Sequence, residues 1–302
     1  MGLSTVSTFK TLQNENNKLK KMNDGQLKSL QKVLLEIIDD IDFVCEKYDI
    51  TYNLGGGSAL GAIRHNGFIP WDDDLDINMP RKDYKKFCEF FIKEFSKKYW
   101  LHTPEKTKDY GLAFARIRKK GTVFRSREDL YNTDEAGVYI DLFIIENIYD
   151  SVILRYLQGF LSMAFGFLLS CRNFYRNKHF YMDMVKNNRK LRLKFRMKII
   201  IGFFISWISV DKMTHIWNNV NSMCKNDNSK YVSVPVGRNH FFGEIYERNK
   251  FCKTIKHIFE GESRKLPICI DYDGYLTHMY GDYMKIPKKE NRETHIFLEF
   301  KL

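Results

Sequence analysis

Apolar residues recur along the chain at intervals that are first helical and then strand-like, and this pattern predicts a mixed α/β fold. From Leu27 to Val44 they fall three and four residues apart, which predicts an amphipathic helix with Asn23 or Asp24 as its N-cap. Further helices are expected at residues 59–65 and 83–95. Short apolar runs predict strands at 51–54, 74–79, 112–118, 122–125 and 137–145.

The pattern changes at about residue 151. Residues 156–171 and 199–210 contain no charged side chain, and residues 172–198 between them carry ten Lys or Arg against one acid, Asp183. Both apolar runs are shorter than the roughly 20 residues of a membrane span. We expect an interfacial helical pair beside a polybasic segment, with a buried hairpin or a span at 152–171 as alternatives.

These shifts divide the chain into three parts. Residues 1–150 would form an N-terminal helix and a catalytic core, and residues 151–228 a helical, basic insertion that contacts the membrane surface. In residues 229–302 short strands and helices return, and this part would complete the catalytic domain.

Composition and charge narrow the class of protein. The 302 residues are 44% hydrophobic and 28% charged, which is typical of a globular chain rather than a disordered one. The net charge of +12 predicts attraction to an anion, such as a phosphorylated small molecule or the inner leaflet of a membrane. The apolar segments that flank the basic stretch argue against nucleic acid as the partner.

Cysteine usage and the N-terminus indicate the compartment. The six cysteines include no C-x-x-C pair, which argues against a zinc ribbon and favours a reduced, cytosolic chain. Residues 1–21 are polar and contain no apolar stretch of the signal-peptide kind. We therefore expect a cytoplasmic protein, peripheral at the inner face of the cell membrane.

The candidate chemistry lies in a glycine turn followed by clustered acids. Gly56, Gly57 and Ser58 lead into a predicted helix, whose N-terminal N–H groups would bind phosphate. Asp74 and Asp76 lie two apart on a predicted strand, so that both carboxylates would project from one face. Neighbouring carboxylates repel unless a cation lies between them, and hard oxygen ligands suit Mg²⁺ or Mn²⁺.

A third acid, Asp141, lies inside an apolar predicted strand, where a charge is costly unless it is paired or binds a metal. It would complete the metal site or deprotonate a hydroxyl, and the alternative is a structural aspartate paired with an arginine. Arg64 is assigned to phosphate binding, with a surface ion pair as the alternative. Arg81, Arg116 and Arg118 could also bind phosphate, but an ion pair explains each of them equally well.

The order of these features is that of polymerase-β-type nucleotidyltransferases, and the longer string is more specific. Residues 54–84, LGGGSALGAIRHNGFIPWDDDLDINMPRKDY, closely resemble the motif of the LicD family. Residues 259–287, with Phe-Glu-Gly, Asp-Tyr-Asp and Tyr-Gly-Asp-Tyr-Met, resemble the family too. Asn53 departs from the aspartate that is frequent there. The resemblance implies an α/β nucleotidyltransferase core, a mixed sheet with flanking helices.

The resemblance also implies a reaction. LicD-like proteins transfer phosphocholine or a polyol phosphate from a CDP-linked donor to a sugar hydroxyl of a teichoic acid, lipopolysaccharide or capsule precursor. Asp74, Asp76 and Asp141 would hold the metal, while Asp72 and Asp73 would shape the loop. The alternatives are a nucleotidyltransferase acting on a sugar phosphate or small molecule, and a catalytically silent membrane-associated partner of envelope assembly.

Overall fold

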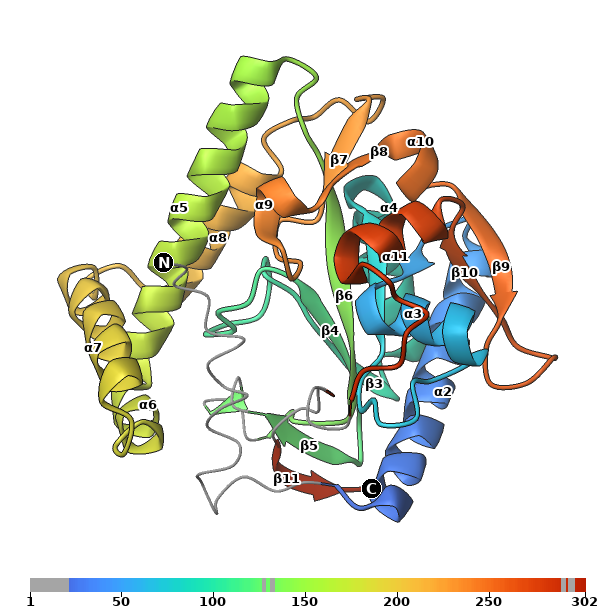
Figure 1. The fold of residues 1–302 in the computed structure, drawn as a ribbon, viewed down its shortest axis with the longest axis horizontal. Helices are drawn as coiled ribbons and strands as arrows, with labels where there is room; N and C mark the ends of the chain where they lie inside the picture. The colour runs from blue at the N-terminus through green and yellow to red at the C-terminus, as the bar shows by residue number, and fades with distance from the viewer. Residues whose placement is uncertain (1–21, 127–128, 131–133, 289–291, 293–296) are drawn as a thin grey trace.

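A mixed β-sheet forms the centre of the fold (Figure 1). The computed structural model describes residues 22–126, 129–130, 134–288, 292 and 297–302. The strand order is β1-β2-β6-β4-β3, and β2 pairs with β6 in parallel while the other pairs are antiparallel. The strands are β1 (Asn53–Leu54), β2 (Asp76–Pro80), β3 (Tyr99–His102), β4 (Ala115–Lys119) and β6 (Tyr139–Asn147).

The C-terminal third returns to this sheet. β7 (Tyr231–Ser233) pairs with the last residues of β6 and with β8 (Ile245–Glu247). β9 (Thr254–Ile258) and β10 (Lys265–Cys269) form a separate hairpin, and β11 (Phe297–Lys301) pairs with β5 (Val123–Ser126). The C-terminal third therefore adds β7 and β8 to the central sheet and contributes to two separate two-stranded sheets.

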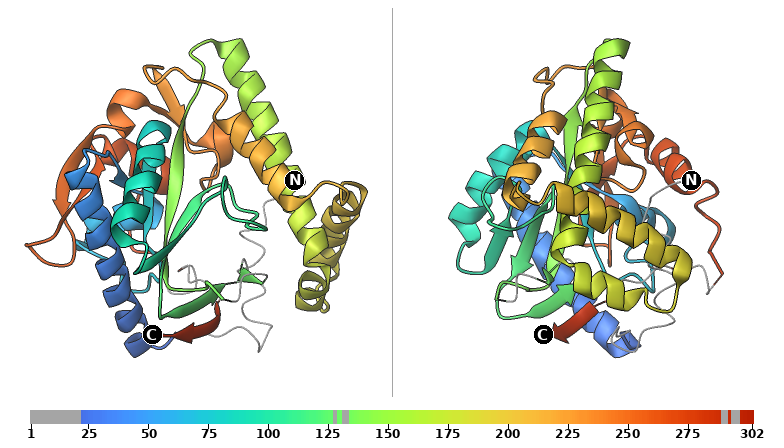
Figure 2. Two further views of the ribbon diagram at one scale, coloured as in Figure 1. Left: turned by 180° about the vertical axis from the view of Figure 1, so that it is seen from behind. Right: turned by 90° about the vertical axis from the view of Figure 1, so that its left-hand side faces the viewer.

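Helices cover both faces of the sheet. α2 (Asp24–Lys47) and α4 (Arg81–Phe95) lie on one face, and α3 (Gly56–His65) and α11 (Tyr272–Tyr280) lie on the other (Figures 1 and 2). Two further short helices are α9 (His240–Gly243) and α10 (Arg248–Phe251). The arrangement is mixed α/β, as the hydrophobic pattern predicts.

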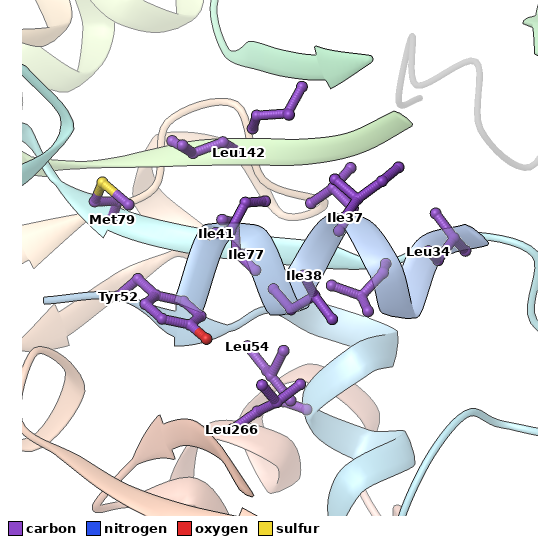
Figure 3. Close-up of a cluster of buried hydrophobic side chains, with 14 of the residues drawn as sticks. Leu34, Ile37, Ile38, Ile41, Tyr52, Leu54, Ile77, Met79, Leu142 and Leu266 are labelled. Atoms are coloured by element: carbon purple, nitrogen blue, oxygen red, sulfur yellow. The ribbon is translucent and has the colours of Figure 1, made fainter. Parts of the chain in front are cut away.

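α2 anchors the core. Asn23 caps it, because its side chain accepts a hydrogen bond from the Gln26 N–H, and the Gln26 side chain accepts one from the Asn23 N–H. The apolar stripe of α2, including Ile37, Ile38 and Ile41, packs against strand residues such as Ile77 and Leu142 (Figure 3). The helix and the cap predicted from sequence are confirmed.

The middle of the chain forms a helical arm beside the sheet (Figure 1). Its helices are α5 (Val152–Arg176), α6 (Lys178–Met184), α7 (Arg189–Phe204) and α8 (Val210–Asn221). Within the described part of the chain, α5 is the helix that is long and apolar enough to cross a membrane by length and composition, and 22% of its most apolar window is buried. The apolar run 199–210 is divided between α7 and α8, because the helix ends at Phe204.

One predicted strand begins later than expected. The sequence predicts a strand over residues 74–79, but β2 starts at Asp76. β1 has two residues, which pair with Ile77 and Asn78, so that no ladder forms along Asp74 and Leu75 on that side. The expectation that Asp74 and Asp76 share one face of a strand is therefore wrong, because Asp74 lies in the preceding loop.

Gly61 allows the loop that carries the acids to approach α3. A Cβ there would lie 2.4 Å from the Gly67 carbonyl oxygen and 3.1 Å from the Ile69 nitrogen. We expect Gly61→Ala to lower the free energy of unfolding by about 1–3 kcal/mol despite the better helix propensity of alanine. Chemical denaturation followed by circular dichroism measures this change.

The matched control is Gly25→Ala in α2, where the nearest atom to a new Cβ is the Asn23 Oδ1 at 3.4 Å. That change should leave the free energy of unfolding unchanged or raise it by up to about 1 kcal/mol. Equal destabilisation by both substitutions would show that the contact with Gly67 does not matter.

Candidate active site

The sheet register brings two of the predicted acids side by side. Asp76, the first residue of β2, is the register partner of Asp141 in β6, and Asp141 is the partner of Arg116 in β4. Register partners on neighbouring strands lie about 5 Å apart and point to the same face. A Cβ placed on Gly56 would lie 3.8 Å from the Asp76 Oδ2, so this face is the one that α3 covers.

Arg116 holds Asp141 by both of its oxygens. The Arg116 Nε donates to the Asp141 Oδ1 at 2.6 Å, and Nη2 donates to Oδ2 at 3.1 Å. The Arg116 side chain is 2% exposed and that of Asp141 14%, so this bidentate pair is largely shielded from water. The observed contacts of Asp141 are therefore those of the second prediction, an aspartate that is paired with an arginine.

The glycine turn is tied to this acidic face by hydrogen bonds. The Asp76 N–H donates to the Ser58 Oγ at 2.8 Å, and the Gly56 N–H donates to the Tyr275 hydroxyl at 2.8 Å. A Cβ on Gly57 would lie 2.9 Å from the Asp72 Oδ2, so a carboxylate already lies at the N-terminus of α3. An incoming phosphate would meet that carboxylate, and it therefore needs a cation between them.

The predicted arginines have different positions. Arg64 lies in the last turn of α3 and donates to the Tyr283 carbonyl at 2.7 Å, and burial lowers its pKa. Arg81 is buried in an ion pair with Glu146, with a further bond to Glu105. Arg118 is buried and pairs with Asp129. Arg81 and Arg118 therefore have structural partners, and Arg64 braces the segment that follows α11.

The C-terminal strings that resemble the family pack around the motif. Glu260 accepts a hydrogen bond from the Phe68 N–H at 2.9 Å, and the Glu260 N–H donates to the Asn66 carbonyl at 2.8 Å. The hydroxyl of Tyr280 lies 3.5 Å from the Cβ position of Gly56. The Phe-Glu-Gly string thus holds the loop before the acids, and the Tyr-Gly-Asp-Tyr-Met string begins at the site. The sequence marks both strings but assigns them no role.

The pKa of the Tyr280 hydroxyl is shifted by the charged groups around the site. Burial raises the pKa of its hydroxyl, Arg238 opposes that shift, and the carboxylates of Asp76, Asp72 and Asp74 add to it. Three acids of the motif therefore lie near one hydroxyl, although Asp74 is outside the strand. The sequence marks the string that begins at Tyr280 but does not single out Tyr275 or Arg238, because contacts between distant segments leave no local pattern.

The carboxylate groups at this site fit a hard divalent cation in part. Asp74 and Asp76 supply carboxylate oxygens of the kind that Mg²⁺ and Mn²⁺ prefer. Both oxygens of Asp141 accept from Arg116, and each carboxylate oxygen has a second lone pair, so this pairing by itself does not prevent Asp141 from binding a metal. Among the residues that the structure describes, no three His, Cys, Asp or Glu side chains are gathered as a metal site.

The fold and this face define a mixed α/β protein with a glycine turn beside clustered acids. Residues 49–161 match the family model described as LicD/FKTN/FKRP, nucleotidyltransferase domain. This match to the LicD family model agrees with the resemblance found in the sequence.

Comparison with individual proteins extends the similarity beyond that domain. The chain is 27% identical to the lipopolysaccharide cholinephosphotransferase LicD of Haemophilus influenzae over 287 residues, which are 89% of this chain and 95% of that protein. It is also 42% identical over 50 residues, 17% of the chain, to an uncharacterized protein of Rickettsia prowazekii, of which they are 19%.

The Arg116–Asp141 pair leads to a stability prediction. Asp141→Asn removes the charge opposite a buried guanidinium, so we expect the free energy of unfolding to fall by roughly 3 kcal/mol. In an Arg116→Met background the same substitution should cost much less, and denaturant titrations of the four proteins give this coupling energy. Additive effects would show that the pair does not contribute to stability.

Proposed function

We propose that this protein transfers phosphocholine or a polyol phosphate from a CDP-linked donor to a sugar hydroxyl of a cell-surface glycan precursor, with Mg²⁺ or Mn²⁺ as cofactor. The observation that carries this proposal is the similarity to a cholinephosphotransferase over nearly the full length of both chains. The geometry supports it, because the glycine turn, Asp76 and Asp141 lie on one face of the sheet. Lipopolysaccharide, teichoic acid and capsule precursors are the acceptor classes.

Each group on this face has a role in the proposed reaction. The acceptor oxygen forms a bond to the phosphorus that bears the alcohol, the bond from phosphorus to CMP breaks, and the acceptor proton passes to Asp141. N–H groups at the start of α3 would bind phosphate oxygens, and Ser58 fixes the strand that carries Asp76. A divalent cation at Asp74 and Asp76 would offset charge on the phosphates. Arg116 keeps the Asp141 carboxylate in place.

We propose a pocket near the turn as a candidate site for the choline group. It has a volume of about 310 Å³ and is lined by the rings of Tyr246, Phe251 and Tyr275, together with Glu247 and Lys250. Aromatic faces attract quaternary ammonium groups. Tyr275 connects this pocket to the glycine turn through its bond with Gly56.

A panel of donors separates the reactions. CMP release from CDP-choline, CDP-ribitol and CDP-glycerol identifies the alcohol. In a nucleotidyltransferase the nucleotide would instead appear on the product. Absence of donor binding in the presence of Mg²⁺ or Mn²⁺ would favour the catalytically silent partner.

We expect Asp74→Asn and Asp76→Asn each to lower the transfer rate by roughly 100-fold or more, because loss of one carboxylate removes several kcal/mol of transition-state stabilisation. CMP release at saturating Mg²⁺ measures the rate, and thermal unfolding checks that the fold persists. Asp183→Asn, an exposed acid of α6, is the matched control and should retain the wild-type rate.

Asp141→Asn should also be inactive. If it keeps the full rate and loses stability alone, Asp141 is a structural residue and the proposed proton transfer is wrong. Near-normal turnover of Asp74→Asn and Asp76→Asn at saturating metal would contradict the proposed metal site.

We further propose that the helical arm lies on an anionic membrane surface at the cytoplasmic face, where a lipid-linked acceptor is presented. Along α7 the exposed side chains Leu193, Met197, Ile200 and Phe204 recur at helical spacing. Arg189 and Arg192, also exposed, lie beside that stripe. An apolar stripe bordered by basic residues is typical of interfacial helices. Phe160 of α5 and Trp207 are further exposed apolar side chains of the arm, at 63% and 80% exposed.

Vesicle flotation tests this surface. The protein should float with vesicles that contain anionic lipid and much less with neutral ones, and salt should release part of it. Replacing Arg189, Lys190 and Arg192 by Gln should weaken binding at least tenfold, since each is worth roughly 1 kcal/mol. Transfer to a short soluble acceptor should be unchanged.

The matched control replaces Lys28, Lys32 and Lys85, three exposed lysines of α2 and α4, by Gln. It should float like the wild type. Partitioning that resists salt and needs detergent would indicate that α5 spans the membrane, and no vesicle binding would leave a helical arm that packs without lipid.

A further inference from the structure

Three arginines, Arg64, Arg116 and Arg238, lie around the acidic site. Arg116 binds both oxygens of Asp141, and Arg64 donates to the backbone carbonyl of Tyr283. Phosphates brought to this face meet the carboxylates of Asp72 and Asp76, and so need positive charge nearby. A cation at the rim of the site would meet that need.

Arg238 lies at this rim. It is exposed, in the loop between β7 and α9, and its Cζ lies 5.9 Å from the centre of the Tyr280 ring. The Tyr280 hydroxyl in turn lies 3.5 Å from the Cβ position of Gly56, and the Asp76 Oδ2 lies 3.8 Å from the same position. Arg238, Tyr280, the glycine turn and Asp76 thus form a continuous row of neighbours.

The loop that carries Arg238 is held by a buried acid. Glu244 is 2% exposed, and its Oε1 accepts a hydrogen bond from the Asn239 N–H at 3.0 Å. The Asn239 side chain contacts the Met279 sulfur at 3.4 Å, and a Cβ at Gly237 would lie 2.9 Å from the Glu244 Oε1. The backbone on both sides of Arg238 therefore lies against Glu244, Asn239 also contacts α11 through Met279, and the Arg238 side chain is exposed.

We infer that Arg238, supported by the ring of Tyr280, binds a phosphate of the nucleotide at the rim of the acidic site. This inference rests on the proposed function and names a residue that neither the motif nor the glycine turn contains. The guanidinium is suited to the task, because its planar N–H groups bind two phosphate oxygens at once. Tyr280 keeps the guanidinium near Gly56 by a contact between cation and ring.

Titration calorimetry with CDP and Mg²⁺ tests the inference without turnover. Arg238→Gln should raise the Kd for CDP roughly tenfold or more and leave the Kd for cytidine, which has no phosphate, unchanged. Arg238→Lys should recover part of the affinity. Tyr280→Ala should weaken CDP binding, and its effect should not add to that of Arg238→Gln. Lys32→Gln, the same change of charge on α2, is the matched control.

The outcomes separate the inference from the proposed function. If Arg238→Gln binds CDP with the same Kd as wild type, the inference is overturned. It is also overturned if Arg238→Gln weakens the binding of cytidine as much as that of CDP, because that result would indicate a role of Arg238 in folding of the loop. If wild type binds pyrophosphate but neither CDP nor CMP, the proposed function fails, and Arg238→Gln must still weaken pyrophosphate binding for the inference to hold. If wild type binds none of these, both are overturned.

Discussion

The parallel pairing of β2 with β6 is the constraint on which the rest of this structure depends. It places Asp76 in register with Asp141 and, through the antiparallel β4, places Arg116 next to Asp141. On the same strands Ile77 and Leu142 face α2, which closes the core from the other side. One set of backbone hydrogen bonds therefore determines both the packed face and the charged face of the sheet.

The charged face is balanced rather than simply acidic. Asp72 lies at the N-terminus of α3, Asp141 is paired with Arg116, and Arg238 lies beyond the Tyr280 ring. The carboxylate of Asp72 thus lies close to the N-terminus of α3, where the helix N–H groups attract further anions. A phosphate can bind at this site only if cations offset the charge of the neighbouring carboxylates. A divalent metal and an arginine at the rim would both supply such charge.

The C-terminal third supports this face from outside the matched domain. Tyr275 binds the N–H of Gly56, Glu260 holds the loop at Phe68, and β7 extends the sheet at the end of β6. The similarity to the Haemophilus protein covers nearly all of the chain, whereas the family model covers residues 49–161. The helical arm instead carries exposed apolar and basic side chains, which gives the molecule two surfaces of different chemistry.

The sequence by itself determined the helix of α2 with its Asn23 cap, the positions of five strands (β1, β2, β4, β5 and β6) within a few residues and the glycine–aspartate motif, because these depend on local spacing and neighbouring residues. The tertiary structure decided that Asp74 precedes the strand, that Asp141 pairs with Arg116 and that Arg81 is buried against Glu146. It also decided that Tyr280 and Arg238 lie beside the turn. Partners that are 25 to more than 200 residues apart are chosen by sheet register and helix packing, which leave no periodicity along the chain.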